Sequence, residues 1–275
     1  MAGVFAPPGA RTRVDRWDGP RRESVSDALA VEEPLAVRVN DQPFTVTMRT
    51  PGDDLALVAG LLFAEGVIRS ADDIALMVHC GSGEDADWAN AVKVVLGDGR
   101  TVPLASARNL VSATSCGLCG KTTIDALRVD QEPLPNGPAI PAALLYALPE
   151  AMRARQEVFA STGGLHAAAL FDADGQLVAV GEDVGRHNAV DKVIGRALTD
   201  RLVPLERHVL MVSGRLSYEI VQKAIAARVP VVAAISAPST LAVELASAFN
   251  QTLVGFLRGE RMNVYCGGDR ILNGR

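Results

Sequence analysis

Residues 166–198 read HAAALFDADGQLVAVGEDVGRHNAVDKVIGRAL, and this stretch decides the fold class. Its two apolar runs, 166–171 and 176–180, are typical of strands, and the periodic segment 187–198 is typical of a helix. Strands that alternate with helices need crossover connections, which indicates a largely parallel or mixed sheet. The same alternation continues along the chain, with strands predicted at 209–212, 229–235 and 252–257 and helices at 217–227 and 239–249.

The chain is long enough for two domains. It has 275 residues, and the segment 130–138 holds three of its 15 prolines, which favours a linker there. We therefore predict a C-terminal α/β domain over 139–275 that begins with a helix at 142–155. With the smaller domain before the linker, the fold class is α/β, or α+β overall.

The region before the linker predicts a smaller α+β domain over 31–130. Asn40 and Asp41 provide turn chemistry between two strands at 35–39 and 44–48, and a helix follows until Gly66. Residues 1–30 are rich in Pro, Gly and Arg without apolar periodicity, so we expect a flexible leader with structure starting near Pro34. Further elements are predicted as strands at 74–80 and 91–96 and a helix at 121–127.

Composition excludes several classes of protein. The chain is 48% hydrophobic and 21% charged, unlike a disordered or collagen-like chain. A net charge of −5 and 4% aromatic residues argue against a nucleic-acid binder. No apolar stretch is long enough to span a bilayer, and the amino terminus lacks the apolar core of a secretory signal. We expect a cytoplasmic protein with reduced thiols and no membrane partner.

The segment Ser115–Lys121, SCGLCGK, is the strongest local signal for chemistry. Its thiols Cys116 and Cys119 lie three positions apart, and a positive charge and a helix start beside them favour the thiolate. A thiolate attacks sulfur electrophiles or binds a metal. A structural zinc site would need two more ligands, from Cys80 or His79 and from Cys266. A zinc deaminase would need Pro before the first cysteine, where this chain has Ser115, and a His or Cys ligand followed by Glu.

Three glycine-containing turns stand at predicted strand ends, at 161–166, 181–188 and 213–215. Turns of this kind line the crevice where open α/β sheets hold ligands. Arg186 and Arg215 stand beside helix starts, where backbone amides already favour anions, so phosphate is the expected ligand class. For His187 we leave open a capping or core role, and we expect His166 to be structural.

A third candidate is a tight turn between a strand and a return strand near the carboxyl end. Two arginines flanking such a turn can clamp a phosphate or a guanine edge, although most isolated hairpin tips are solvated turns. Its residues are Phe256, Leu257, Arg258, Gly259, Glu260 and Arg261.

Taken in order, these motifs resemble the FdhD family, the formate dehydrogenase accessory sulfurtransferases. The resemblance runs from about residue 30 to the carboxyl end. It rests on RTPGDD at 49–54, SCGLCG at 115–120, STGGLH at 161–166, GEDVGRHNAVDK at 181–192, SGR at 213–215 and the Phe256–Arg261 turn.

The resemblance implies a sulfur carrier. Such a protein takes persulfide sulfur from a cysteine desulfurase and passes it to the molybdenum or tungsten cofactor, a bis-molybdopterin guanine dinucleotide, before the cofactor enters formate dehydrogenase. It also implies a homodimer and a three-layer C-terminal domain similar to cytidine deaminases, with no metal held directly by the protein.

Carried over by position, Cys116 is the expected persulfide carrier and Cys119 an accessory thiol. The guanine region matches Phe256–Arg261, for which GDP is a mimic, and Arg186 and Arg215 are our own candidates for cofactor phosphates. Two other function classes stay open at this point: a zinc-dependent hydrolase of the deaminase type, and a cofactor-binding chaperone without sulfur transfer.

Overall fold

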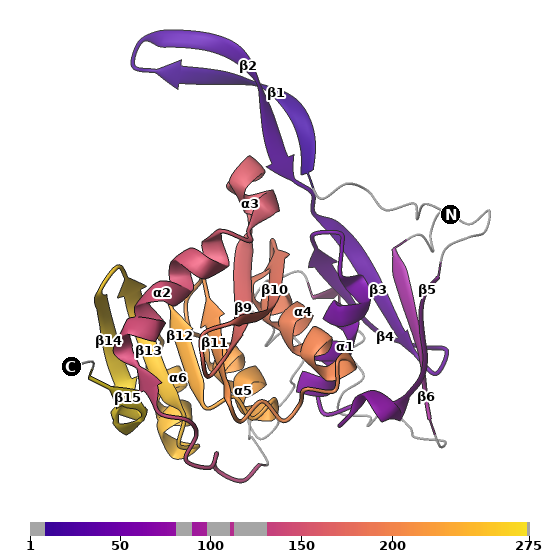
Figure 1. Ribbon diagram of the computed structural model, residues 1–275. Coiled ribbons are helices and arrows are strands. Elements are labelled where there is room, and N and C mark those ends of the chain that lie inside the picture. The colour runs from indigo at the N-terminus through magenta and orange to yellow at the C-terminus, as the bar shows by residue number, and fades with distance from the viewer. Residues whose placement is uncertain (1–8, 81–89, 98–110, 113–130, 274–275) are drawn as a thin grey trace.

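A computed structural model describes residues 9–80, 90–97, 111–112 and 131–273. Its larger sheet is six-stranded, in the order β10-β9-β11-β12-β13-β14 (Figure 1). Strands β11, β12 and β13 are parallel and their other neighbours pair antiparallel, so the predicted mixed sheet is confirmed. The strands are β9 (His166–Asp172), β10 (Leu177–Asp183), β11 (His208–Val212), β12 (Val231–Ala234), β13 (Thr252–Arg258) and β14 (Arg261–Cys266).

Helices cover both faces of this sheet. On β9, Ala168 and Leu170 point to one core, and Ala167, Ala169 and Phe171 point to the other. This alternation follows from the two-residue period of a strand, so an apolar run such as 167–171 must be covered on both sides. Helix α2 (Ala142–Arg153) covers the second face, and α4 (Arg186–Thr199), α5 (Tyr218–Ala226) and α6 (Thr240–Ala248) cover the first, which gives three layers.

A second sheet has the order β5-β6-β3-β4-β7 and packs against one helix, α1 (Asp54–Ala64). Asn40 and Asp41 both have positive φ, 49° and 64°, as a tight hairpin turn requires, so the predicted hairpin is confirmed. The strands are β3 (Glu33–Val39), β4 (Gln42–Arg49), β5 (Ile74–Cys80), β6 (Ala91–Leu96) and β7 (Val111–Ser112).

Residues 9–30 correct the prediction of a leader without structure. They form a hairpin of β1 (Gly9–Asp18) and β2 (Arg21–Ala30) that projects from the body, with its base against the short helix α3 (Glu157–Thr162) (Figure 1). Most of its side chains are exposed on both faces, so the sequence shows no apolar alternation. Its strands are instead linked by polar pairs, including Arg22 with Asp15 at 2.5 Å and Arg22 over the ring of Trp17.

The remaining described elements are short. Strand β8 (Ile140–Pro141) pairs with β15 (Ile271–Leu272), and single 3-10 turns cover Ala71–Asp73 and Gly268–Arg270. The helix predicted at 121–127 lies outside the described residues, and the domain ranges stay predictions. No helix in the described part of the chain is both long enough and apolar enough to cross a bilayer.

Helices α1 and α4 join the two sheets through a contact between their backbones. A Cβ added to Gly195 would lie 1.8 Å from the carbonyl oxygen of Ala56, and one added to Gly60 would lie 2.0 Å from that of Asp191. Both glycines are therefore needed for the two helices to approach this closely.

We expect Gly195→Ala to lower the free energy of unfolding by about 1–3 kcal/mol, the usual cost of overpacking. The sign of this change is informative, because in an unobstructed helix Ala is more stable than Gly by about 1 kcal/mol. Urea unfolding measures the change in the free energy of unfolding. Gly97→Ala is the control, since its Cβ would meet nothing closer than 3.8 Å. An unchanged or raised stability for Gly195→Ala would contradict the packing described here.

Candidate functional site

The three glycine turns predicted from the sequence meet at one edge of the six-stranded sheet. β10, β11, β12 and β13 all end at this edge, and β9 starts there. The loops after β11 and β12 are joined by hydrogen bonds from Leu216 N to the Ala237 oxygen and from Ser239 N to the Leu216 oxygen. Phe256 N in turn donates to the Ser236 oxygen at 3.1 Å. Backbone hydrogen bonds thus link the loops after β11 and β12 to the end of β13, at the edge where open α/β sheets hold ligands.

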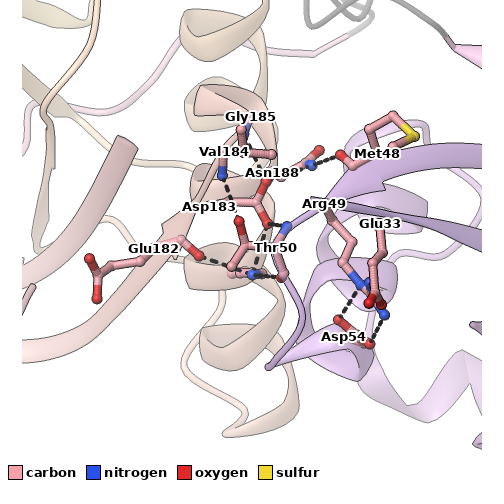
Figure 2. A network of polar contacts seen from close by, with 11 residues as sticks. Glu33, Met48, Arg49, Thr50, Asp54, Glu182, Asp183, Val184, Gly185 and Asn188 are labelled. Atoms are coloured by element: carbon pink, nitrogen blue, oxygen red, sulfur yellow. Dashed lines mark hydrogen bonds and ion pairs between the residues drawn. The ribbon is translucent and has the colours of Figure 1, made fainter. Parts of the chain in front are cut away.

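Asp183 fixes the turn that leads into α4. Its carboxylate is fully buried and lies 2.8 Å from Lys192 Nζ. It also accepts hydrogen bonds from the backbone N–H groups of Thr50 and Gly185 and from the Asn188 side chain, at 2.8–3.1 Å (Figure 2). The Asp183 carboxylate lies at the end of β10 in the larger sheet, and Thr50 directly follows β4 in the second sheet. The contact therefore connects the two sheets.

Arg49 holds the start of α1 in the same region. Its guanidinium is buried and donates to both carboxylate oxygens of Asp54 at 3.0 Å, and also to Glu33 (Figure 2). It donates to Asn90 as well, at 2.8 Å. Bidentate pairing of this kind fixes direction as well as distance. The 49–54 motif therefore has a structural role in joining β4 to α1, beside the Thr50 contact to Asp183.

His187 is a buried member of a polar cluster at the starts of α4 and α5. Its Nε2 lies 2.8 Å from the Glu219 carboxylate and 3.1 Å from the Ser217 hydroxyl. A lone pair on Nε2 would repel an ionised carboxylate at this distance, which favours a proton on Nε2. One helical turn further, Lys223 donates to both oxygens of Asp191 at 2.7 and 2.9 Å. Burial raises the pKa of Asp191, and Lys223 opposes that rise.

Arg186, the first residue of α4, has no acidic partner among the described residues. Its Nε is buried and meets no hydrogen-bond acceptor there. Gly214 is buried beside it: a Cβ at Gly214 would be in ordinary van der Waals contact, 3.6 Å from Arg186 Cδ and 3.4 Å from His166 Nδ1. A buried donor that meets no acceptor is one that an anion can satisfy.

His166 lies near Arg186 and Gly214, a proximity that the sequence analysis did not predict. Burial lowers its pKa below the ordinary value, and the nearby charges of Arg186 and His187 lower it further, while Asp183 opposes them and Arg215 adds a smaller effect. The expectation of a purely structural histidine rested on its place at the start of an apolar strand. The informative signal was the strand order, which places the start of β9 beside the ends of β10 and β11.

The Phe256–Arg261 turn lies at the β13 end of the same edge. Phe256 is 43% exposed and has φ of 53°, a conformation that costs a bulky residue about 1–3 kcal/mol and is concentrated at functional sites. Leu257 is buried, Glu260 is exposed, and Gly259 adopts positive φ in the turn. Arg258 and Arg261 are exposed, and Arg258 Nε donates to the Ile235 oxygen at 3.3 Å. Tyr265, an aromatic that the sequence analysis did not select, lies against Gly255.

Cys116 and Cys119 lie outside the described residues. The two described cysteines are on different sheets: Cys80 ends β5 and Cys266 ends β14. The Cys266 thiol donates to the Gln251 oxygen at 3.2 Å, and burial raises its pKa, so it is a poor nucleophile. Within the described ranges, His, Cys, Asp and Glu side chains form no group of three that could hold a metal ion.

Comparisons with known proteins agree on one family. A model of the FdhD/NarQ family matches residues 30–272. A relative from Streptomyces coelicolor named sulfur carrier protein FdhD is 52% identical over 254 residues, which cover 89% of each chain. The protein of the same name from Nocardia farcinica is 50% identical over 264 residues, 95% of this chain and 94% of that one.

A solved structure shares the fold. The crystal structure of a protein described as a formate dehydrogenase accessory protein, from Desulfotalea psychrophila, matches with a TM-score of 0.76 at 25% identity. The match covers 97% of this chain and 100% of that chain.

Proposed function

The chain belongs to the FdhD/NarQ family, and we propose that it is a sulfur carrier that serves the maturation of formate dehydrogenase. In this proposal a cysteine desulfurase supplies persulfide sulfur to Cys116. The acceptor is the bis-molybdopterin guanine dinucleotide cofactor of molybdenum or tungsten, before the cofactor enters the enzyme. The names of the relatives support the carrier role, and the neighbouring structure's description supports the accessory role.

Sulfur loading needs a thiolate and no oxidant. The Cys116 thiolate attacks the outer, sulfane sulfur of the desulfurase persulfide, a new S–S bond forms, and the desulfurase cysteine leaves as a thiolate. Lys121, five positions on, favours the thiolate form of Cys116 by its charge. We propose that Cys119, three positions after Cys116 in the sequence, holds or resolves the sulfur as an accessory thiol.

The sheet edge carries the cofactor-binding part of the proposal. Adjacent strands lie about 4.8 Å apart, so the Arg215 loop after β11 and Phe256 on β13 are separated by about 10 Å along the edge. This is comparable with the span of a nucleotide from its base to its diphosphate. Phe256 offers a face for one guanine, and Arg258 and Arg261 offer planar donors for its edge.

The donor set fits the client cofactor. Arg186 presents a buried Nε donor that meets no acceptor in the described part of the chain. When bound, the cofactor supplies the metal centre that accepts sulfur. The residues Arg186 and Arg215 would hold phosphate oxygens, while the Phe256 turn would hold guanine. We propose a homodimer as the assembly, as the family resemblance implies.

Phe256→Ala is expected to weaken GDP binding about tenfold or more. Stacking of a base on an aromatic ring is worth about 1–3 kcal/mol, and 1.4 kcal/mol is a tenfold change in affinity. Isothermal titration of the full chain with GDP measures it. The control is Leu76→Ala, which removes a side chain of similar exposure, 47%, from the other sheet. Equal GDP affinity for wild type and Phe256→Ala would remove the turn from the proposed site.

A further inference from the structure

We propose that the projecting hairpin of residues 9–30, the arm, joins two copies of this chain, and that its β1 strand pairs antiparallel with β1 of the second copy. The inference rests on the homodimer of the proposed function. It deepens that proposal by naming the strand that makes the contact and the register in which it pairs.

The arm is a sheet of two strands, with no third strand beside it among the described residues (Figure 1). A two-stranded hairpin is at best marginally stable in water, and stable sheets usually have three or more strands. The base of the arm contacts α3, while most side chains along its length are exposed on both faces. The open edge of such a hairpin is a template for a strand from another chain.

Strand β1 is complementary to itself in one register. When two β1 strands run antiparallel with Val14 of one copy opposite Val14 of the other, each Arg13 lies opposite an Asp15. The same register places each Arg11 opposite a Trp17, a cation beside an aromatic ring. Opposite charges directly across a ladder stabilise it, and twofold symmetry makes each of these pairs occur twice.

Neighbouring registers are repulsive. A twofold axis perpendicular to the sheet keeps the same face up in both copies, so residues that lie opposite each other must share a face. A register centred on Thr12 would place Arg11 opposite Arg13. Registers centred on Arg13 or on Asp15 would place two like charges at the axis. Charge therefore selects the register centred on Val14.

This register also gathers the apolar residues of the arm. Val14 lies opposite Val25 within the hairpin, and both are partly buried although most of the arm is exposed. Pairing through β1 would place four valines in one row across a four-stranded sheet, which supplies the strands and the apolar surface that a lone hairpin lacks. The matching register of β2, centred on Val25, would instead place Glu23 opposite Asp27.

Cysteine cross-linking of the full-length protein tests the register. Residues directly opposite in antiparallel strands have Cα atoms about 4.5–5.5 Å apart, a separation that a disulfide can span. Val14→Cys should therefore give a covalent dimer on mild oxidation, above the level that the native cysteines give in wild type. Val25→Cys is the matched control, because three strand spacings, about 14 Å, separate this residue in the two copies.

Charge exchange tests the same contact without a new cysteine. Arg13→Asp and Asp15→Arg each create two like-charge pairs and should weaken dimerisation about tenfold, as measured by sedimentation equilibrium. The double variant Arg13→Asp with Asp15→Arg restores opposite charges across the axis and should recover most of the wild-type affinity. A variant whose arm had merely unfolded would not be rescued in this way. Asp27→Arg reverses an exposed charge on β2 and should leave the dissociation constant unchanged.

The outcomes separate the arm contact from the homodimer. If the single charge variants dimerise as wild type does and Val14→Cys gives no cross-link, the arm contact is wrong while the homodimer stands. If wild type is monomeric, both are wrong and the arm is left for a different protein. A cross-link at Val14 but not at Val25, with rescue by the double charge variant, supports the pairing.

Discussion

A Cys116→Ala protein is expected to fold normally and to leave formate dehydrogenase inactive. Alanine has no thiol to accept sulfane sulfur, so loading cannot begin. Mass spectrometry after incubation with a cysteine desulfurase and cysteine measures the first step. The wild-type peptide that contains Cys116 should gain about 32 Da for each sulfur atom bound, and the variant peptide should gain nothing. Cys266→Ala is the control, because the raised pKa of that half-buried thiol makes it a poor nucleophile and predicts normal activation.

Other results would favour a different function. A wild-type Cys116 peptide without any sulfur adduct would contradict the carrier mechanism. Stoichiometric zinc that is lost on Cys116→Ser or Cys119→Ser would indicate a hydrolase of the deaminase type. Activation of formate dehydrogenase that survives loss of both cysteines, with GDP binding intact, would indicate a cofactor-binding chaperone without sulfur transfer.

Lys192→Met is expected to cost about 3–5 kcal/mol of unfolding free energy, the usual effect of removing one partner of a buried ion pair. Lys192 is 3% exposed and Asp183 fully buried, so the carboxylate would stay in the interior without its cation. The variant also loses the hydrogen bonds from Nζ to the carbonyl oxygens of Thr50 and Glu182. Chemical unfolding followed by circular dichroism measures the change.

Two further variants test the cause. Arg201→Gln removes the solvent-exposed pair between Arg201 and Asp72 and should leave stability unchanged. Asp183→Asn combined with Lys192→Met should cost less than the sum of the single variants, since neither charge is then left alone. A free energy of unfolding for Lys192→Met within about 1 kcal/mol of wild type is the range of a surface ion pair. That result would show that the Asp183–Lys192 pair does not stabilise the contact between the two sheets.

The sequence predicted the elements in which apolar side chains face the core and polar side chains face the solvent. Strands such as 166–171 and helices such as 187–198 carry apolar residues at the period of the element, and the structure places them within one or two residues of prediction. The hairpin of residues 9–30 gave no such signal, because both of its faces are exposed and its pairing depends on backbone and charged contacts.

The candidate site could be predicted only in part, for a related reason. Arg186 and Arg215 could be selected because each stands beside a glycine turn. The position of His166 beside Arg186 could not be predicted, because only the strand order brings His166 close to Gly214, 48 residues away. The positive φ of Phe256 could not be predicted either, because aromatic residues rarely adopt this conformation and no neighbouring residue indicates it.

The close contact between α1 and α4 has a consequence for how this protein can change during evolution. Gly60 and Gly195 lie on opposite sides of the proline-rich linker, as do Thr50 and Asp183, yet each pair meets in space. An amino-terminal half taken from another lineage would therefore have to supply a matching helix surface and a matching backbone donor. The two halves are expected to be inherited together, and recombination between them should be selected against.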